Sequence, residues 1–141
     1  MEFINLRQAG AELGLACARL AAFHYAGGRR VLIMAADQNQ AADLDRLLWT
    51  FDPASFIPHA QAGAPDQDQE PVLIALSPQN LNRAQVLILA APTQEPPLKG
   101  FDWVVLFVPA KEGPELAQSR EVYRRLKQDG AVELLHSTRL P

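Results

Sequence analysis

Four short, uninterrupted apolar runs constrain the fold of this chain more than any other feature of its sequence. They span Val31–Ala35, Val72–Leu76, Val86–Leu89 and Trp103–Val108. Strands buried on both faces have continuous apolar runs, whereas strands with one solvated face alternate apolar and polar residues. The four runs therefore predict the central strands of a parallel sheet that is covered on both faces.

Segments with a helical spacing of apolar residues separate these runs. The first ends at Gly27-Gly28, because glycine readily takes the left-handed conformation that closes a helix. The second follows Asp37, whose side chain suits the N-cap position. The third has Pro114 in its first turn, where proline is well tolerated. We expect the helices over residues 8–25, 38–49 and 114–128.

Shorter segments complete the predicted architecture. Residues 1–6 and 131–135 are expected to form strands, residues 56–59 a short edge segment, and residues 60–71 a polar loop that contains glycine and proline. Strands that alternate with helices indicate a parallel sheet between two helical layers. We therefore predict an α/β fold, with residues 1–141 forming a single three-layer α/β/α domain with a mostly parallel sheet.

The charge and cysteine content narrow the classes of function. The chain has 13 basic and 16 acidic residues, a formal charge of −3, whereas proteins that wrap DNA usually carry a basic excess. Cys17 is the only cysteine, so no intramolecular disulfide forms and a reducing compartment is favoured. No run approaches the roughly 20 apolar residues of a membrane span. We expect a soluble cytoplasmic protein with no membrane partner.

Motifs for catalysis and for cofactor binding are absent. The sequence contains neither GxxxxGK[ST] nor GxGxxG, and His24, His59 and His136 have no Cys or His at metal-binding spacing. Cys17 fits the apolar face of the first helix. Asp37 stands where some nucleotide enzymes bind ribose, but without a glycine loop a helix-capping role is favoured. We expect no catalytic site, no metal and no cofactor.

The last helix carries a stripe of basic and aromatic side chains. Arg120, Tyr123, Arg124 and Lys127 follow the i, i+3, i+4, i+7 spacing that puts residues on one helix face. One interpretation is an ordinary solvated face. The other is a docking site for an anionic partner that also has an apolar part.

A second aromatic group lies near the proline-bounded turn after the second helix. It contains Trp49, Phe51, Phe56 and Ile57. Such residues are either core anchors or the walls of a surface pocket, and the sequence leaves both open. A tryptophan stacked on a basic side chain would suit a pocket for an acidic peptide.

Four segments, in this order, resemble a known family. They are GRRVLIMAADQNQAADLDRLLW, SFIPH, FDWVVLFVP and REVYRRLKQDG, and together they resemble the chi subunit of the bacterial DNA polymerase III holoenzyme. The resemblance runs from Ala11 to His136. None of the segments is a catalytic signature, and the specificity comes from their combination.

The resemblance implies a non-catalytic accessory subunit of the clamp-loader assembly in DNA replication. Chi proteins connect the psi subunit of the clamp loader to single-stranded DNA-binding protein. They hold the disordered C-terminal tail of that protein, which is acidic and ends in phenylalanine. DNA would then be a partner only indirectly.

The family's tail-binding residues map by motif onto this chain. A tryptophan after the second helix, a phenylalanine in the SFxPH segment, and an arginine and a tyrosine of the last helix correspond to Trp49, Phe56, Arg120 and Tyr123. A guanidinium suits the terminal carboxylate, since its fork matches two oxygens. The aspartates of the tail need further cations, which Arg124 and Lys127 would supply. We expect the four mapped residues to converge on one surface.

Two alternatives belong to other classes of function. One is a nucleotide-dependent α/β enzyme with an unconventional phosphate loop, which would bind nucleotide at the carboxyl edge of the sheet. The other is a direct binder of single-stranded DNA that uses the basic and aromatic stripe. Comparing intact with tail-deleted single-stranded DNA-binding protein separates this binder from the adaptor.

Overall fold

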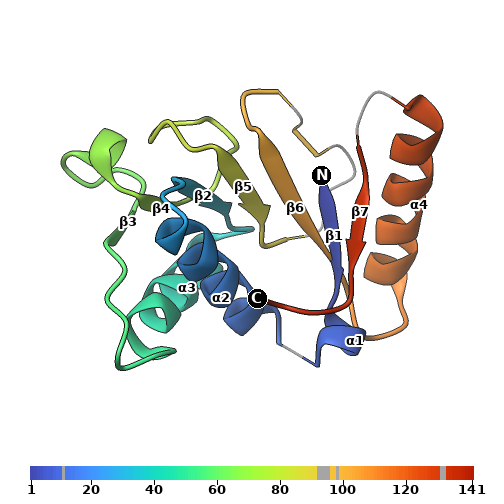
Figure 1. The fold of residues 1–141 in the computed structure, drawn as a ribbon, viewed down its shortest axis with the longest axis horizontal. Coiled ribbons are helices and arrows are strands. Elements are labelled where there is room, and N and C mark those ends of the chain that lie inside the picture. The colour runs from blue at the N-terminus through green and yellow to red at the C-terminus, as the bar shows by residue number, and fades with distance from the viewer. Residues whose placement is uncertain (11, 92–95, 98, 131–132) are drawn as a thin grey trace.

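Within the described residues, seven parallel strands form a sheet at the centre of the computed structural model of this chain (Figure 1). The structure describes residues 1–10, 12–91, 96–97, 99–130 and 133–141. The strands are β1 (Glu2–Asn5), β2 (Val31–Met34), β3 (His59–Gln61), β4 (Val72–Ala75), β5 (Val86–Leu89), β6 (Trp103–Val108) and β7 (Leu135–Ser137). Their order is β3-β4-β2-β5-β6-β1-β7, and each neighbouring pair is parallel. The four apolar runs are confirmed as the strands β2, β4, β5 and β6.

Helices cover both faces of the sheet. They are α1 (Leu6–Ala9), α2 (Leu13–Ala26), α3 (Gln38–Thr50) and α4 (Pro114–Asp129), with a short 3-10 turn, η1 (Gln67–Gln69). Side chains alternate between the two faces of each strand. Val31 and Ile33 of β2 pack with α2 and α3, whereas Leu32 belongs to the second core cluster, which α4 covers. The predicted α/β architecture is therefore confirmed.

The buried face of α2 contains small side chains, which let it lie close to the sheet and to α3. Ala16, Cys17 and Ala21 of this helix are buried. A Cβ atom at Gly14 would lie 2.7 Å from Cδ1 of Leu47 in α3, closer than carbon atoms normally approach. The prediction that Cys17 lies on the apolar face of this helix is therefore confirmed.

The prediction of one helix over residues 8–25 is wrong at its start. A four-residue helix, α1, follows β1 directly and ends at Gly10, whose φ of 66° is left-handed. The backbone N–H of Gly10 donates to the carbonyl of Arg7, which closes α1 before α2 begins at Leu13. Glycine takes this conformation without a Cβ penalty. Ala11 lies outside the described residues.

Two edge segments also differ from the prediction. The expected loop over residues 60–71 contains part of β3 and the turn η1. β3 lies at one edge of the sheet and pairs only with β4. Its residues can be polar because an edge strand needs no apolar run. The last strand begins at Leu135 rather than at residue 131, and residues 131 and 132 lie outside the described part. β7 pairs with β1 at the other edge.

The N-cap of α3 provides a test of the fold. The Asp37 carboxylate accepts a hydrogen bond of 2.8 Å from the backbone N–H of Gln40. We expect Asp37→Ala to lower the free energy of unfolding by about 1 kcal/mol, because a helix N–H loses its acceptor. Urea denaturation measures this change.

Asp43→Ala is the matched control for this substitution. Asp43 lies on the same helix in an exposed ion pair with Arg46, and such pairs contribute little to stability. Equal losses for the two variants would contradict the capping role of Asp37.

Candidate functional site

A large cavity of about 1010 Å³ lies between α4 and the ends of β1, β6 and β7. All four residues of the predicted stripe line it, namely Arg120, Tyr123, Arg124 and Lys127. The remaining lining residues are Phe3, Asn5, Arg7, Gln8, Val108, Pro109, Ala110, Glu112, Leu116, Ser119 and His136. We call this space the α4 cavity. The prediction that the four stripe residues share one surface is confirmed.

The local sequence of α4 positions the stripe. Pro114 occupies its first turn, and Gly130 closes it with a left-handed φ of 67°. Leu116 and Val122 are the buried residues of the helix, and Val122 packs in the core cluster on this face of the sheet. The Tyr123 ring packs edge-to-face on the buried Phe3 ring, with centroids 5.1 Å apart. This contact places Tyr123 between the solvent and the core.

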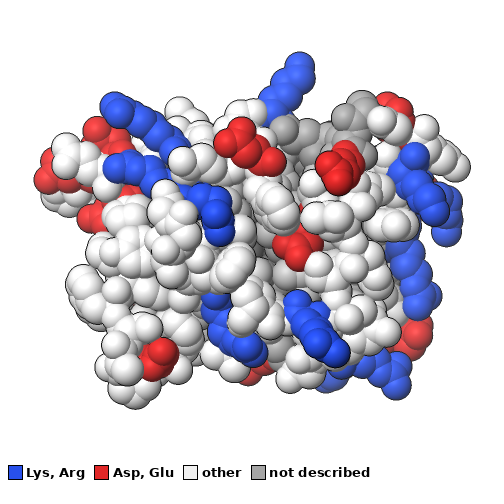
Figure 2. All heavy atoms as spheres, viewed as in Figure 1, with Lys and Arg blue, Asp and Glu red and all other residues white. Residues whose placement is uncertain are grey.

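The α4 cavity concentrates positive charge in an acidic chain. Arg7, Arg120, Arg124 and Lys127 line it, together with one acid, Glu112. Figure 2 shows Lys and Arg side chains gathered over α4, at the right of the view. Arg124 also pairs with Glu121, but both side chains are more than half exposed, so the pair is weak. Clustered cations raise the local concentration of anions.

A smaller, mainly apolar cavity adjoins the α4 cavity. Its volume is about 220 Å³, and the two cavities share Pro109, Ala110 and Ser119. Its apolar walls are Leu6, Leu13, Leu89, Ala90, Ala91, Leu106, Phe107 and Val122. We call it the apolar slot. A cationic cavity next to an apolar slot can accept a ligand that combines a carboxylate with an apolar side chain.

Trp49 and Phe56 form a separate group with His59. Their ring centroids are 5.7 Å apart, and the Trp49 ring lies 4.7 Å from the His59 ring. The exposed fractions of Trp49 and Phe56 are 53% and 67%, which is high for large apolar side chains. We call Trp49 and Phe56 the aromatic surface, because the side chain of His59 is buried. Nearby, Phe51 is partly buried and Ile57 is buried in the core.

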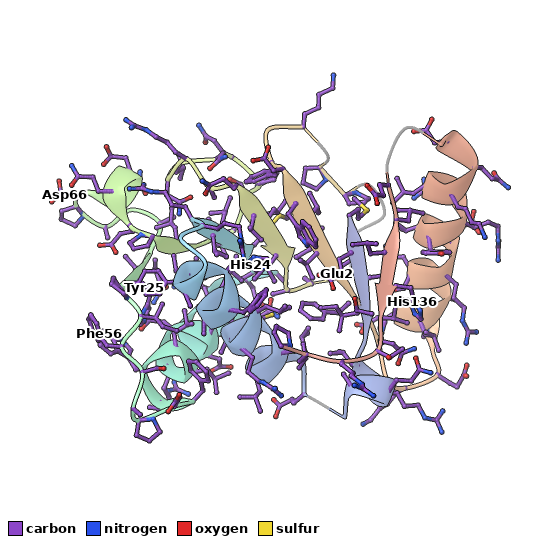
Figure 3. The ribbon with its side chains drawn as sticks, in the orientation of Figure 1. Glu2, His24, Tyr25, Phe56, Asp66 and His136 are labelled. Atoms are coloured by element: carbon purple, nitrogen blue, oxygen red, sulfur yellow. The ribbon has the colours of Figure 1, made fainter. Side chains whose placement is uncertain are left out.

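The expected convergence of Trp49 and Phe56 with Arg120 and Tyr123 is wrong. α3 packs on the opposite face of the sheet from α4, beside the edge strand β3, whereas β7 forms the other edge. Six inter-strand steps separate the edges, or about 29 Å at 4.8 Å per step. In Figure 3, Phe56 and His136 lie at opposite sides of the molecule. One short peptide therefore cannot contact both groups.

Comparison with known proteins identifies the family. The family described as "DNA polymerase III chi subunit, HolC" matches residues 1–133. The DNA polymerase III subunit chi of Haemophilus influenzae is 36% identical over 119 residues, which cover 82% of this chain and 80% of that protein. This chain belongs to the DNA polymerase III chi subunit family.

Two further relatives in the chi family support the assignment. The subunit chi of Escherichia coli is 35% identical over 108 residues, covering 74% of each chain. That of Pseudomonas aeruginosa is 33% identical over 136 residues, covering 93% of this chain and 88% of that protein.

The thiol of Cys17 lies outside the α4 cavity of this chi family member. Cys17 is fully buried, and burial raises the pKa of its thiol to about 12, so it packs as a core residue and is not a nucleophile.

Among the described residues, no group of three or more His, Cys, Asp or Glu side chains could hold a metal ion. No helix in that part of the chain has the length and apolar character needed to cross a membrane.

The sequence did not point to Arg7 or His136 as lining residues of the α4 cavity. Both come from elements that the sequence analysis placed imperfectly, the short helix α1 and the strand β7. Neither belongs to a periodic pattern, so only the pairing of β1 with β6 and β7 brings them to the cavity.

The surroundings of His24 in the fold favour its neutral form. Arg29 Nε donates a hydrogen bond of 2.8 Å to His24 Nδ1, which requires an unprotonated nitrogen. Burial lowers the pKa of His24, as does the Arg29 charge, while Glu2 raises it. The unfolded chain therefore takes up this proton at a higher pH than the folded chain does.

The stabilising effect of neutral His24 is present above about pH 6.5, the pKa of unperturbed histidine. It is lost as the pH falls through the folded pKa. We expect the free energy of unfolding to fall between about pH 7.5 and about pH 5.5, and to fall less in His24→Gln. Urea denaturation at both pH values measures this, and identical decreases in the two proteins would contradict it.

Proposed function

We propose that this chain is a non-catalytic accessory subunit of DNA polymerase III. In this role it joins the psi subunit to the acidic C-terminal tail of single-stranded DNA-binding protein. The observation that carries the proposal is the α4 cavity, where Arg120, Arg124 and Lys127 lie beside Tyr123 and adjoin the apolar slot. The chemistry of this site matches an acidic peptide that ends in phenylalanine.

Each part of such a tail has a complementary region in the site. The terminal carboxylate suits Arg120, because a guanidinium can donate two parallel N–H bonds to it. The phenylalanine ring suits the apolar slot, where Lys111 is also a lining residue. Arg124 and Lys127 follow Arg120 along α4 and supply cations for the upstream aspartates. The contact is small, so we expect an affinity of about micromolar that salt reduces.

The aromatic surface is the part of the molecule that we assign to psi. Trp49 and Phe56 are exposed beside each other, and aromatic residues often dominate the binding energy of protein interfaces. The aromatic surface and the α4 cavity lie on opposite faces and at opposite edges of the sheet. Both partners can therefore bind at once, which a bridging subunit requires.

Replacing Arg120 tests the assignment of the tail. We expect Arg120→Ala to weaken binding of a short acidic peptide ending in Pro-Phe by about ten- to a hundredfold, because a charge-assisted bond contributes about 1.5–3 kcal/mol. Arg125→Ala is the control on the same helix, since Arg125 does not line the α4 cavity. Calorimetry at two salt concentrations measures both affinities.

The outcomes of this experiment separate two modes of binding. A loss confined to Arg120→Ala supports a specific carboxylate contact, provided that both variants melt like the wild type. Equal losses for the two variants would mean that general positive charge binds the peptide. Equal binding of an uncharged peptide that ends in Pro-Phe would also contradict the electrostatic part of the proposal.

Replacing Trp49 and Phe56 tests the second surface. We expect the double variant Trp49→Ala, Phe56→Ala to lose psi binding by at least about tenfold, since buried aromatic contacts are typical hot spots. Its affinity for the acidic peptide should be unchanged, because the α4 cavity lies on the other face of the sheet. Pull-down and calorimetry with purified psi measure these effects.

Phe23→Ala is the matched control for the loss of an exposed aromatic ring. Phe23 is 48% exposed on α2, where its ring packs on that of His24. If the double variant kept psi and lost the peptide, the assignment of the two surfaces would be reversed.

A further inference from the structure

We infer that Arg7 is a second guanidinium for the terminal carboxylate of the bound peptide, in addition to Arg120. This inference rests on the function proposed above and adds a residue of α1 to the site. Arg7 and Arg120 line the same cavity from different elements, α1 and α4. A carboxylate between them would be held from two sides.

The pairing of the strands brings Arg7 to this position. β1 and β6 are parallel with Asn5 opposite Val108, so α1 begins where β6 ends. Pro109 and Ala110, which follow β6, line both the α4 cavity and the apolar slot. Arg7 therefore lies near the junction of the two spaces, where a peptide whose terminal ring enters the slot would have its carboxylate.

Arg120 lines the α4 cavity from α4 and follows a residue at the junction. Its neighbour Ser119 also lines both spaces. Arg124 and Lys127 come four and seven residues later, about 6 and 10 Å further along the helix axis. These two cations therefore suit the upstream acidic side chains, whereas Arg7 and Arg120 suit the terminal carboxylate.

The local structure fixes the backbone of Arg7 and leaves its side chain exposed. The Asn5 side chain accepts a hydrogen bond of 3.0 Å from the N–H of Gln8 at the start of α1. Gly10 closes the other end of this helix. Among the described residues, no ion pair includes Arg7, and Glu112 is the acid that shares its cavity.

The chemistry of a carboxylate allows two guanidinium partners. An ionised carboxylate has about four lone-pair sites, and a bidentate bond from one arginine uses two of them. The remaining sites can accept N–H bonds from a second arginine. Two cations also offset the repulsion between the bound carboxylate and Glu112.

The test compares two peptides that differ only at the C-terminus. One is the acidic peptide ending in Pro-Phe with a free carboxylate, and the other is its C-terminal amide. We expect Arg7→Ala to weaken binding of the free-acid peptide by about tenfold and to leave binding of the amide nearly unchanged. Arg7→Lys should fall between, because lysine keeps the charge but lacks the fork.

Arg46→Ala is the control for the loss of one exposed arginine, since Arg46 lies on α3 and pairs with Asp43. If Arg7→Ala behaves like Arg46→Ala with the free-acid peptide, the inference fails while the proposed tail site stands. If Arg7→Ala weakens both peptides equally, Arg7 acts on the upstream acids and the inference also fails. If the wild type binds neither peptide, the proposed function itself fails.

Discussion

The burial of an all-parallel sheet on both faces is the constraint on which the rest of this structure depends. β2 shows it directly, because Val31 and Ile33 pack on one side and Leu32 on the other, and none of the three is exposed. A parallel sheet needs helices on both faces, which places α2 and α3 opposite α4. The α4 cavity and the aromatic surface, which we propose as binding surfaces for two partners, lie on these opposed layers and are therefore separate.

The distribution of charge follows the same division. The chain is acidic overall, with 16 acidic and 13 basic residues, and this disfavours non-specific attraction to nucleic acid. Four cations nevertheless line the α4 cavity. A local cluster of cations favours an acidic partner over other partners and speeds the association of that partner with the site. The aromatic surface has the opposite character, since its exposed area comes from the rings of Trp49 and Phe56.

The elements that the sequence predicted well are those with a strong local pattern of apolar residues. The continuous runs gave the four central strands, and the spacing of apolar residues gave α3 and α4 to within two residues. The errors lie where local patterns are weak. The break at Gly10 depends on a left-handed turn, and β3 depends on hydrogen bonds to β4 rather than on its own apolar residues. A polar edge segment carries little signal of its pairing.

The candidate site shows the same limit. The sequence by itself determined that Arg120, Tyr123, Arg124 and Lys127 share one helix face, because the geometry of an α-helix fixes that relation locally. It also showed that aromatic residues lie close together in the chain near the turn after α3. Only the tertiary structure decided which residues face each other across space. The strand order placed Trp49 at the far edge from α4 and brought Arg7 to the α4 cavity, because contacts between distant segments depend on how strands pair and which face each helix covers.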